Sequence, residues 1–359
     1  MPARWVAVQC GVKEIFVEIY AIGIDLGKIV FHLVGLDREG NVVVRKKCSR
    51  NQLLTYTANL PVKLIGMEAC SGSHFLGRAL RAQGHEVRLM PAQYVKPYVK
   101  TNKSDYLDAE AIAEAVQRPT MRFVPIKTEE QLDLQAVHRV RERWVMRRTA
   151  LVNQIRGLLL ERGFPLPQGR KHLEQALPLF LAESDASLSA SFQVLLTQMK
   201  LELEQLNTRI EQMDAVIEQQ AREQESCERL TEIPGIGPVT ATALVAAIGN
   251  GAAFRQGREL AAWIGLVPRE HSTGDKQKLL GISKRGNGYL RRLLVQGARA
   301  ILQRRTSQSP GLKNWLTQLS ARTHQNVVIV ALANKLARMA WAVLVKGERY
   351  RAPALALSS

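Results

Sequence analysis

The chain has 359 residues, 46% of them hydrophobic, and its 50 Lys and Arg against 32 Asp and Glu give a formal net charge of +18. This length accommodates two or three domains with their own cores, and the positive charge indicates a polyanionic partner. The four cysteines are scattered without CxxC spacing, which excludes an obvious zinc or disulfide framework and favours a reducing cytoplasm. No apolar run approaches about 18 residues and no secretory signal begins the chain, so we expect no membrane span.

The first third of the chain alternates strand-like and helix-like segments. We assign no function to residues 1–19, although residues 16–20 can lengthen the first strand. Asp37 to Asn41 has the composition of a turn, and Gly84 that of a helix C-cap. The pattern predicts strands at 20–28, 30–36, 42–45, 62–68 and 86–90 and helices at 50–59 and 74–83. Such alternation indicates an α/β sheet.

Four carboxylates stand at the ends of these predicted elements. Asp25 lies in an apolar, β-branched run and Glu68 closes a second one, where a carboxylate is costly unless it is paired or binds a cation. Asp105 and Asp108 are three residues apart at a predicted helix start, so they share a face. Taken singly, Asp25 can be a turn residue and Asp105 a helix cap. Together the four can hold two Mg²⁺ ions, about 3.5–4 Å apart, as in enzymes of phosphoryl transfer.

The middle of the chain is predicted to be helical. Residues 128–163 form a long helix whose stripe of Arg139, Arg143 and Arg147, with Trp144 for stacking, suits a nucleic-acid backbone or is a solvated face. Residues 164–187 contain two prolines and are predicted to be irregular. Beyond them, apolar residues at alternating spacings of four and three predict a coiled-coil seam, formed by Met199, Leu203, Leu206, Ile210, Met213 and Ile217. That seam packs either against the preceding long helix or against another protomer.

The last third carries two further motifs. Residues 230–244 are typical of a helix-hairpin-helix, in which Gly235 and Gly237 let backbone N–H groups approach a phosphate. A plain helix turn is the alternative. Next, Ser272 and Thr273 lie in a glycine-containing loop amid basic residues, where a hydroxyl can attack a phosphate and cations can stabilise the developing charge. Both hydroxyls can instead cap a turn. The basic residues of this region are Lys276, Lys284, Arg285, Arg291 and Arg292.

From about residue 20 to 347 these motifs resemble those of the DEDD transposases, the RNA-guided bridge recombinases of bacterial insertion sequences. The resemblance implies a RuvC-like, ribonuclease-H-type α/β domain at 20–125, a helical coiled-coil linker at 126–228, a mainly α transposase domain with a helix-hairpin-helix at 229–350 and a tail at 351–359. Asp25, Glu68, Asp105 and Asp108 correspond to the metal-binding carboxylates. Ser272 corresponds to the nucleophile, with Thr273 as the alternative because some members place it directly before the glycine.

The resemblance also implies the partners. These are double-stranded donor and target DNA, a structured non-coding guide RNA and further copies of the chain, as a dimer to tetramer in the bacterial cytoplasm at the nucleoid. Because recombination needs several protomers, we prefer a seam between protomers.

Other functions remain open. A Holliday-junction-resolvase-like endonuclease would use the carboxylates with water as nucleophile, and an inactive nucleic-acid-binding scaffold would need neither. The actin-like ATPases begin with a similar glycine turn, but the later glycine-rich phosphate loops are lacking in this sequence.

Overall fold

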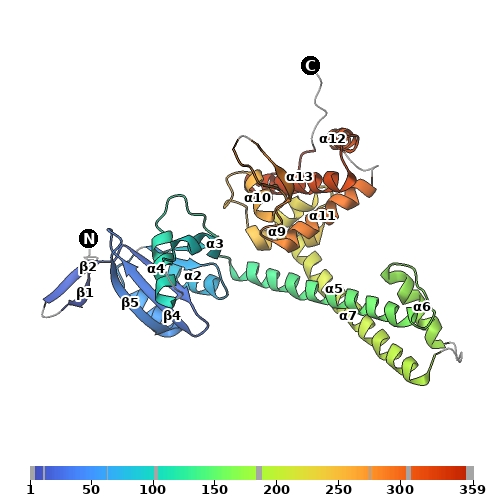
Figure 1. Cartoon of the computed structure of the whole chain (residues 1–359), viewed down its shortest axis with the longest axis horizontal. Coiled ribbons are helices and arrows are strands. Elements are labelled where there is room, and N and C mark those ends of the chain that lie inside the picture. The colour runs from blue at the N-terminus through green and yellow to red at the C-terminus, as the bar shows by residue number, and fades with distance from the viewer. Residues whose placement is uncertain are drawn as a thin grey trace, which may run out of the picture. The chain divides into compact units, whose positions relative to one another are not determined.

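The structure is a computed structural model that describes residues 5–10, 13–62, 64–100, 104–182, 188–274, 276–304 and 309–352. The chain divides into two compact units, Met1–Glu129 and Glu130–Ser359 (Figure 1). Unit 1 is α/β and unit 2 is mainly helical.

Unit 1 begins with a separate hairpin of β1 (Trp5–Cys10) and β2 (Lys13–Glu18), which pair antiparallel. The main sheet starts only at Ala21. The expectation that residues 16–20 lengthen the first strand is wrong for residues 16–18, which pair with β1 instead. The backbone N–H of Tyr20 does donate to the Leu36 carbonyl of β4 at 2.8 Å.

The main sheet has five strands in the order β5-β4-β3-β6-β7. β3, β4 and β5 pair antiparallel because short turns join them, whereas β3, β6 and β7 pair parallel through helical crossovers. In the turn before β5, the backbone N–H of Asn41 donates to Asp37 Oδ1 at 2.8 Å. The elements are β3 (Ala21–Leu26), β4 (Val30–Leu36), β5 (Val42–Ser49), α1 (Arg50–Ala58), β6 (Leu64–Glu68), α2 (Ser73–Ala82) and β7 (Glu86–Met90).

Helices cover both faces of this sheet. Because successive side chains of a strand point to opposite faces, Ile22 and Ile24 pack into a core with α1 and α2. Ala21 and Met90 pack instead against α4 (Asp105–Ala115) on the other face. A short α3 (Ala92–Val95) and a 3₁₀ turn, η1 (Lys96–Tyr98), follow β7. The result is a three-layer α/β unit in which α4 lies on the face that carries Asp25.

Unit 2 begins with a helical hairpin of α5 (Glu129–Leu160) and α7 (Ala190–Glu223), with α6 (Arg170–Ala182) packed at its end. Residues 164–187 were predicted to be irregular, but 170–182 form α6. Leu173 and Leu177 are buried against α5 and α7, and Pro178 lies within the helix.

The heptad seam of α7 is covered within the chain. Leu203 and Leu206 are each 2% exposed and share a core with Leu151 and Ile155 of α5. Arg148 of α5 also donates to Asn207 Oδ1 at 3.0 Å. The seam thus packs against the preceding long helix, which differs from our preference for packing between protomers. Trp144, expected to be free for stacking, packs on the same core.

The rest of unit 2 forms a second core. Its long helix α13 packs against α8, α10 and α11. By length and composition alone α13 could cross a membrane, but half of its apolar window is buried inside the unit, so its apolar residues serve this core. The elements are α8 (Glu225–Thr231), α9 (Pro238–Ile248), α10 (Gly257–Ile264), β8 (Pro268–Glu270), β9 (Leu279–Ile282), α11 (Gly288–Gln303), α12 (Pro310–Ser320) and α13 (Gln325–Lys346).

A buried histidine ties α5 to this second core. His138 is 3% exposed, and its ring nitrogens lie 3.0 Å from the hydroxyls of Tyr289 on α11 and Thr242 on α9. Burial, reinforced by Arg141, lowers the pKa of His138 to about 4. The ring is therefore neutral at pH 7, with one nitrogen donating and the other accepting.

The apolar seam of α7 gives a test of the helical hairpin formed by α5 and α7. Replacing Leu206 with Asp buries a charge, which should remove about 3 kcal/mol or more of the unfolding free energy of the hairpin. Leu201 is 45% exposed on the same helix, so Leu201→Asp, with the same change of charge, should cost less than about 1 kcal/mol. Circular-dichroism melting and protease cleavage within 190–223 measure the difference. Equal effects of the two substitutions would contradict the packing.

Candidate functional site

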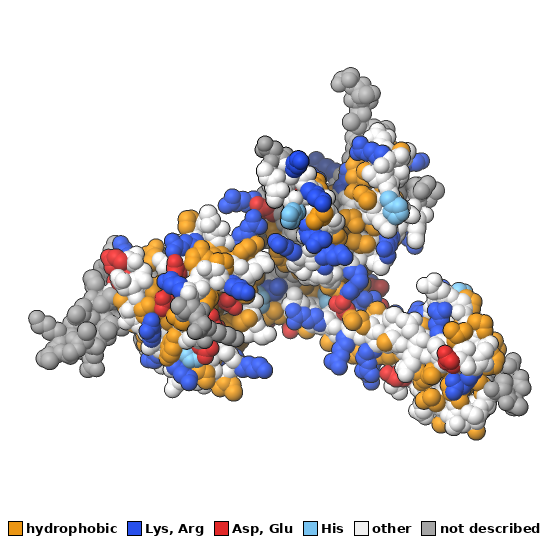
Figure 2. All heavy atoms as spheres, in the orientation of Figure 1, with side chains coloured by type: hydrophobic (Ala, Val, Ile, Leu, Met, Phe, Trp, Pro, Cys, Tyr) orange, Lys and Arg blue, Asp and Glu red, His pale blue; other side chains and the backbone are white. Residues whose placement is uncertain are grey.

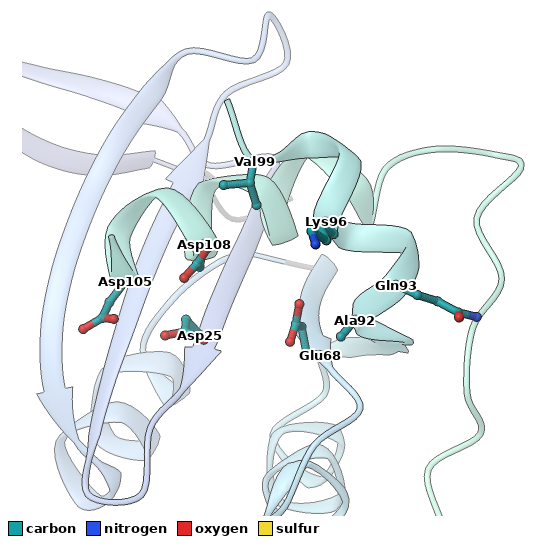
Figure 3. Close-up of a pocket in the computed structure, with 8 residues that line it drawn as sticks. All are labelled: Asp25, Glu68, Ala92, Gln93, Lys96, Val99, Asp105 and Asp108. Atoms are coloured by element: carbon teal, nitrogen blue, oxygen red, sulfur yellow. The ribbon is translucent and has the colours of Figure 1, made fainter. Parts of the chain in front are cut away.

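Asp25 and Glu68 lie at the ends of neighbouring parallel strands. β3 and β6 pair with Gly23 opposite Gly66 and Ile24 opposite Met67, so Asp25 and Glu68 are the next residues at the carboxyl edge. Ile24 and Met67 bury on the face of α1 and α2, so the two carboxylates point to the face of α4. Figure 3 shows both side chains below Asp108.

Asp105 and Asp108 come from the first turn of α4. The backbone N–H of Asp108 donates to the carbonyl of Ser104 at 2.9 Å, which starts the helix. The positive N-terminal end of the helix favours these acids. All four carboxylates line one pocket of about 490 Å³, together with Ala92, Gln93, Lys96 and Val99. The structure thus brings together the four residues that the sequence singled out, whose role as metal ligands stays a prediction.

Two glycines set how closely α4 approaches the strands. A Cβ on Gly23 would lie 2.0 Å from the Ala109 carbonyl oxygen and 2.4 Å from the Ala113 nitrogen. A Cβ on Gly66 would lie 2.7 Å from Val116 Cβ. Gly23 precedes Asp25 by two residues, as Gly66 precedes Glu68, and the two glycines are partners across β3 and β6. This pair therefore lets α4 lie close enough to bring its first turn over the strand ends.

The carboxylates oppose one another's ionisation. Burial raises the pKa of Asp25, and the charges of Asp108 and Asp105 raise it further. The pKa of Glu68 is raised by burial and by the charges of Asp25 and Asp108. A divalent cation would relieve both effects, because it supplies the positive charge that this set of oxygen donors lacks. The residues present therefore fit Mg²⁺ or a similar hard cation.

His32 is a member of this cluster that the sequence analysis missed. It lies on β4 directly opposite Asp25, and its Nδ1 is 3.4 Å from Asp105 Oδ2. The signal was present in the sequence, since His32 interrupts an apolar strand. Without the pairing register of β3 and β4, the sequence did not indicate that His32 lies opposite Asp25.

The second candidate region is the hairpin of β8 and β9 in unit 2. The exposed Ser272 Oγ donates to Glu270 Oε1 at 2.7 Å, and Gln277 Nε2 donates to the same oxygen at 3.2 Å. These two hydrogen bonds, that of Ser272 first, lower the pKa of Glu270. Thr273 instead forms a backbone bridge with Lys276. Ser272 is thus the hydroxyl held by a carboxylate.

The two glycines of the predicted helix-hairpin-helix, in the turn between α8 and α9, differ in their surroundings. Gly235 has a φ of +82°, and a Cβ there would lie 2.6 Å from Ile301 Cδ1 and 2.9 Å from the Gly297 carbonyl oxygen. Gly235 is therefore required for packing against α11. Gly237, the N-cap of α9, faces open space, so it is the glycine of this turn that a phosphate can approach.

The predicted basic contacts fall into two groups. Some guanidinium groups already serve the fold: Arg291 donates to the Ile264 and Arg285 carbonyls at 2.7 and 2.8 Å, Arg292 pairs with Glu142, and Arg147 pairs with Glu202. The other predicted contacts have exposed side chains that form no ion pair within the described part of the chain: Arg139, Arg143, Lys276, Lys284 and Arg285.

Positive charge is concentrated near the C-terminus. Residues 229–359 contain 20 Lys and Arg against 5 Asp and Glu. Figure 2 shows many Lys and Arg side chains, and few acidic ones, on the visible surface of this part of unit 2. A polyanion is therefore the partner that this surface favours.

Comparisons with known proteins agree with this arrangement. The model of a DEDD transposase family of the IS110 type matches residues 22–165, and that of the transposase IS116/IS110/IS902 family matches residues 227–313. A probable family 20 transposase of Pseudomonas aeruginosa is 46% identical over 331 residues, covering 92% of this chain and 98% of the relative. The transposase for insertion sequence element IS1111A of Coxiella burnetii is 42% identical over 334 residues, covering 93% and 92%.

A more distant relative, the pilin gene-inverting protein of Moraxella bovis, is 31% identical over 119 residues, covering 32% of this chain and 35% of the relative. These similarities, with the acidic pocket, define the protein as an insertion-sequence transposase that acts on DNA, and unit 1 as a ribonuclease-H-like α/β domain. Within that class the chain belongs to the IS116/IS110/IS902 family of transposases.

The glycine pair gives a test of how the pocket is built. Gly23→Ala places a methyl group against the backbone of α4, so we expect a loss of about 1–3 kcal/mol or more in stability and a displaced Asp108. Gly157 lies within α5 with open space around it, and Gly157→Ala should be neutral or stabilise by about 0.5–1 kcal/mol. The melting temperature measures the change in stability, and Mn²⁺ binding at the pocket measures the displacement of Asp108. Unchanged melting and binding in Gly23→Ala would contradict the close approach.

Proposed function

We propose that this transposase cuts and rejoins DNA through a covalent serine–phosphate intermediate, with Asp25, Glu68, Asp105 and Asp108 of unit 1 holding two Mg²⁺ ions. The observation that carries the metal site is the convergence of four carboxylates in one pocket, where burial and then the neighbouring acids raise the pKa values of Asp25 and Glu68. Bound cations supply charge stabilisation at the oxygens of a phosphoryl group.

Ser272 is the proposed nucleophile. Its Oγ attacks the phosphorus of a DNA phosphodiester, and the bond from phosphorus to one deoxyribose oxygen breaks. That oxygen leaves with the electron pair and takes a proton from water, which makes it a free hydroxyl. The Ser272 proton passes to Glu270, which already accepts it in a hydrogen bond at 2.7 Å. The hydrogen bonds from Ser272 and Gln277 lower the pKa of Glu270 and so favour its ionised form. In the second step the freed hydroxyl of another strand attacks the serine-linked phosphorus and loses its proton to water. The bond from phosphorus to Ser272 Oγ breaks, and Ser272 regains the proton held by Glu270.

The exposed cations around Ser272 suit this chemistry. Lys276, Lys284 and Arg285 are exposed beside the loop or in the segment that follows β9, where they can contact phosphates and stabilise the charge of the transition state. Thr273 remains the alternative nucleophile. The backbone N–H groups at Gly237 and the exposed Arg139 and Arg143 are proposed to contact the nucleic-acid backbone without reading its sequence.

The partners follow from the family resemblance. We propose double-stranded donor and target DNA, a structured non-coding guide RNA that pairs with both, and a homo-oligomer of two to four chains that acts in the bacterial cytoplasm. The concentration of positive charge in residues 229–359 supports polyanionic partners. Because the α7 seam is covered by α5, the proposed contact between protomers requires a different surface.

A resolvase-like endonuclease is the second candidate, because the acidic pocket alone can activate water with bound metal. The hydrogen bond between Ser272 and Glu270 favours the serine mechanism, because hydrolysis uses water as the nucleophile and requires neither residue. An inactive scaffold is disfavoured by the intact set of carboxylates.

The metal requirement is tested by replacing one carboxylate. Asp25→Asn should lower strand cleavage at least about a hundredfold, as loss of metal support does, while binding to DNA and RNA stays near that of the wild type. Glu39→Gln removes one negative charge from an exposed turn of unit 1 and should leave cleavage unchanged. Cleavage is followed on labelled DNA with and without EDTA, and full activity in EDTA would contradict a metal centre.

The nucleophile is tested by trapping the intermediate. Protein, guide RNA, DNA and Mg²⁺ are incubated and denatured, and a protein–DNA adduct is sought by gel shift and peptide mass. Wild type should carry DNA on Ser272, Ser272→Ala should carry none, and Thr273→Ala should retain some. Because both residues are exposed, melting temperatures should not change. An adduct lost only in Thr273→Ala would assign Thr273, and cleavage without any adduct would favour the resolvase.

A further inference from the structure

His32 stands at the acidic pocket without an assigned role. Its partner in the antiparallel pair of β3 and β4 is Asp25, so the two side chains lie side by side on one face of the sheet. The His32 side chain is only 12% exposed, whereas that of Asp105 is 60% exposed. A partly buried histidine beside a carboxylate cluster requires an explanation.

The ring of His32 has a defined direction. It packs edge-on against the ring of Tyr106, with centroids 4.8 Å apart and planes at 75°. Tyr106 adjoins Asp105 on α4, so the strand and the helix hold the imidazole between them. Nδ1 then points toward Asp105 Oδ2 at 3.4 Å. This distance is long for a hydrogen bond from a ring N–H, for which about 2.9 Å is usual.

The spacing instead fits ligands of one ion. One donor atom each from Asp25, His32 and Asp105 lie within 4.8 Å of one another. Two ligands at about 2.1 Å from a common ion lie about 3 Å apart at right angles and about 4.2 Å apart on opposite sides. The three atoms therefore need only a small closure to surround one cation.

We propose that His32 is a further metal ligand of this pocket, and that one of its cations is bound by Asp25, Asp105 and the imidazole of His32. This inference rests on the proposed metal site and extends its ligand set. An imidazole nitrogen is a softer donor than a carboxylate and raises the affinity for transition metals over Mg²⁺. The pocket should thus bind Mn²⁺ more tightly than an all-carboxylate site would.

The test detects nitrogen beside the metal directly. The full-length protein is loaded with Mn²⁺, and pulsed electron paramagnetic resonance is used to look for coupling to ¹⁴N. Wild type should show the coupling, and His32→Gln and His32→Ala should lose it. His172→Asn serves as the control, because His172 belongs to α6 of unit 2 and is exposed; it should retain the coupling.

Calorimetric titration gives a second readout. His32→Ala should weaken Mn²⁺ binding at least about tenfold and Mg²⁺ binding less, while His32→Asp, an all-oxygen site, should shift the preference toward Mg²⁺. Melting curves establish that each variant is folded. Bound Mn²⁺ without nitrogen coupling in the wild type, or coupling that persists in His32→Ala, would overturn the ligation.

Failure of the whole metal site has a different signature. If Mn²⁺ binds at the pocket, Asp108→Asn weakens that binding whether or not His32 is a ligand. If Asp108→Asn and His32→Ala both bind Mn²⁺ as the wild type does, the pocket is not a metal centre and both proposals fail. If only Asp108→Asn weakens binding, the metal site stands and His32 is not its ligand.

Discussion

The close contact of α4 with the glycine pair of β3 and β6 is the constraint on which unit 1 depends. Gly23 and Gly66 face each other across the parallel strands and leave no room for side chains beneath the helix. Because α4 can lie this close, its first turn reaches the strand ends where Asp25 and Glu68 stand. A wider spacing would separate two carboxylates of the helix from two of the sheet, and their mutual effect on pKa values would fall.

Bringing these acids together has a cost in stability that a cation would offset. Burial and like charge raise the pKa of Asp25 and Glu68, so without a counter-charge their ionised forms are disfavoured in the folded protein. His32, the partner of Asp25 across β3 and β4, adds a nitrogen donor to the cluster. The geometry of the pocket therefore connects fold, electrostatics and proposed metal chemistry through a few positions on three strands and one helix.

Unit 2 depends instead on a buried hydrogen-bonded histidine and on an apolar helix seam. The buried, neutral His138 joins α5 to α9 and α11, while the apolar seam of α7 joins it to α5. These contacts support a core from which the β8–β9 hairpin projects with Ser272 exposed. Basic side chains divide between those that hold loops together, such as Arg291, and those that stay exposed for a polyanion, such as Lys284. A scaffold of this kind leaves the hydroxyl of Ser272 accessible on a loop.

The sequence by itself determined the alternation of elements in unit 1, the four carboxylates and the basic serine loop, because strand periodicity, turn residues and charge are local properties of the chain. It also carried the family resemblance. Only the tertiary structure decided that His32 faces Asp25, that Gly235 packs against Gly297, that Glu270 accepts from Ser272 and that the α7 seam is covered by α5. Register, helix packing and side-chain direction join residues far apart in the chain, and a pattern along the sequence does not encode which distant partner satisfies an apolar or polar face.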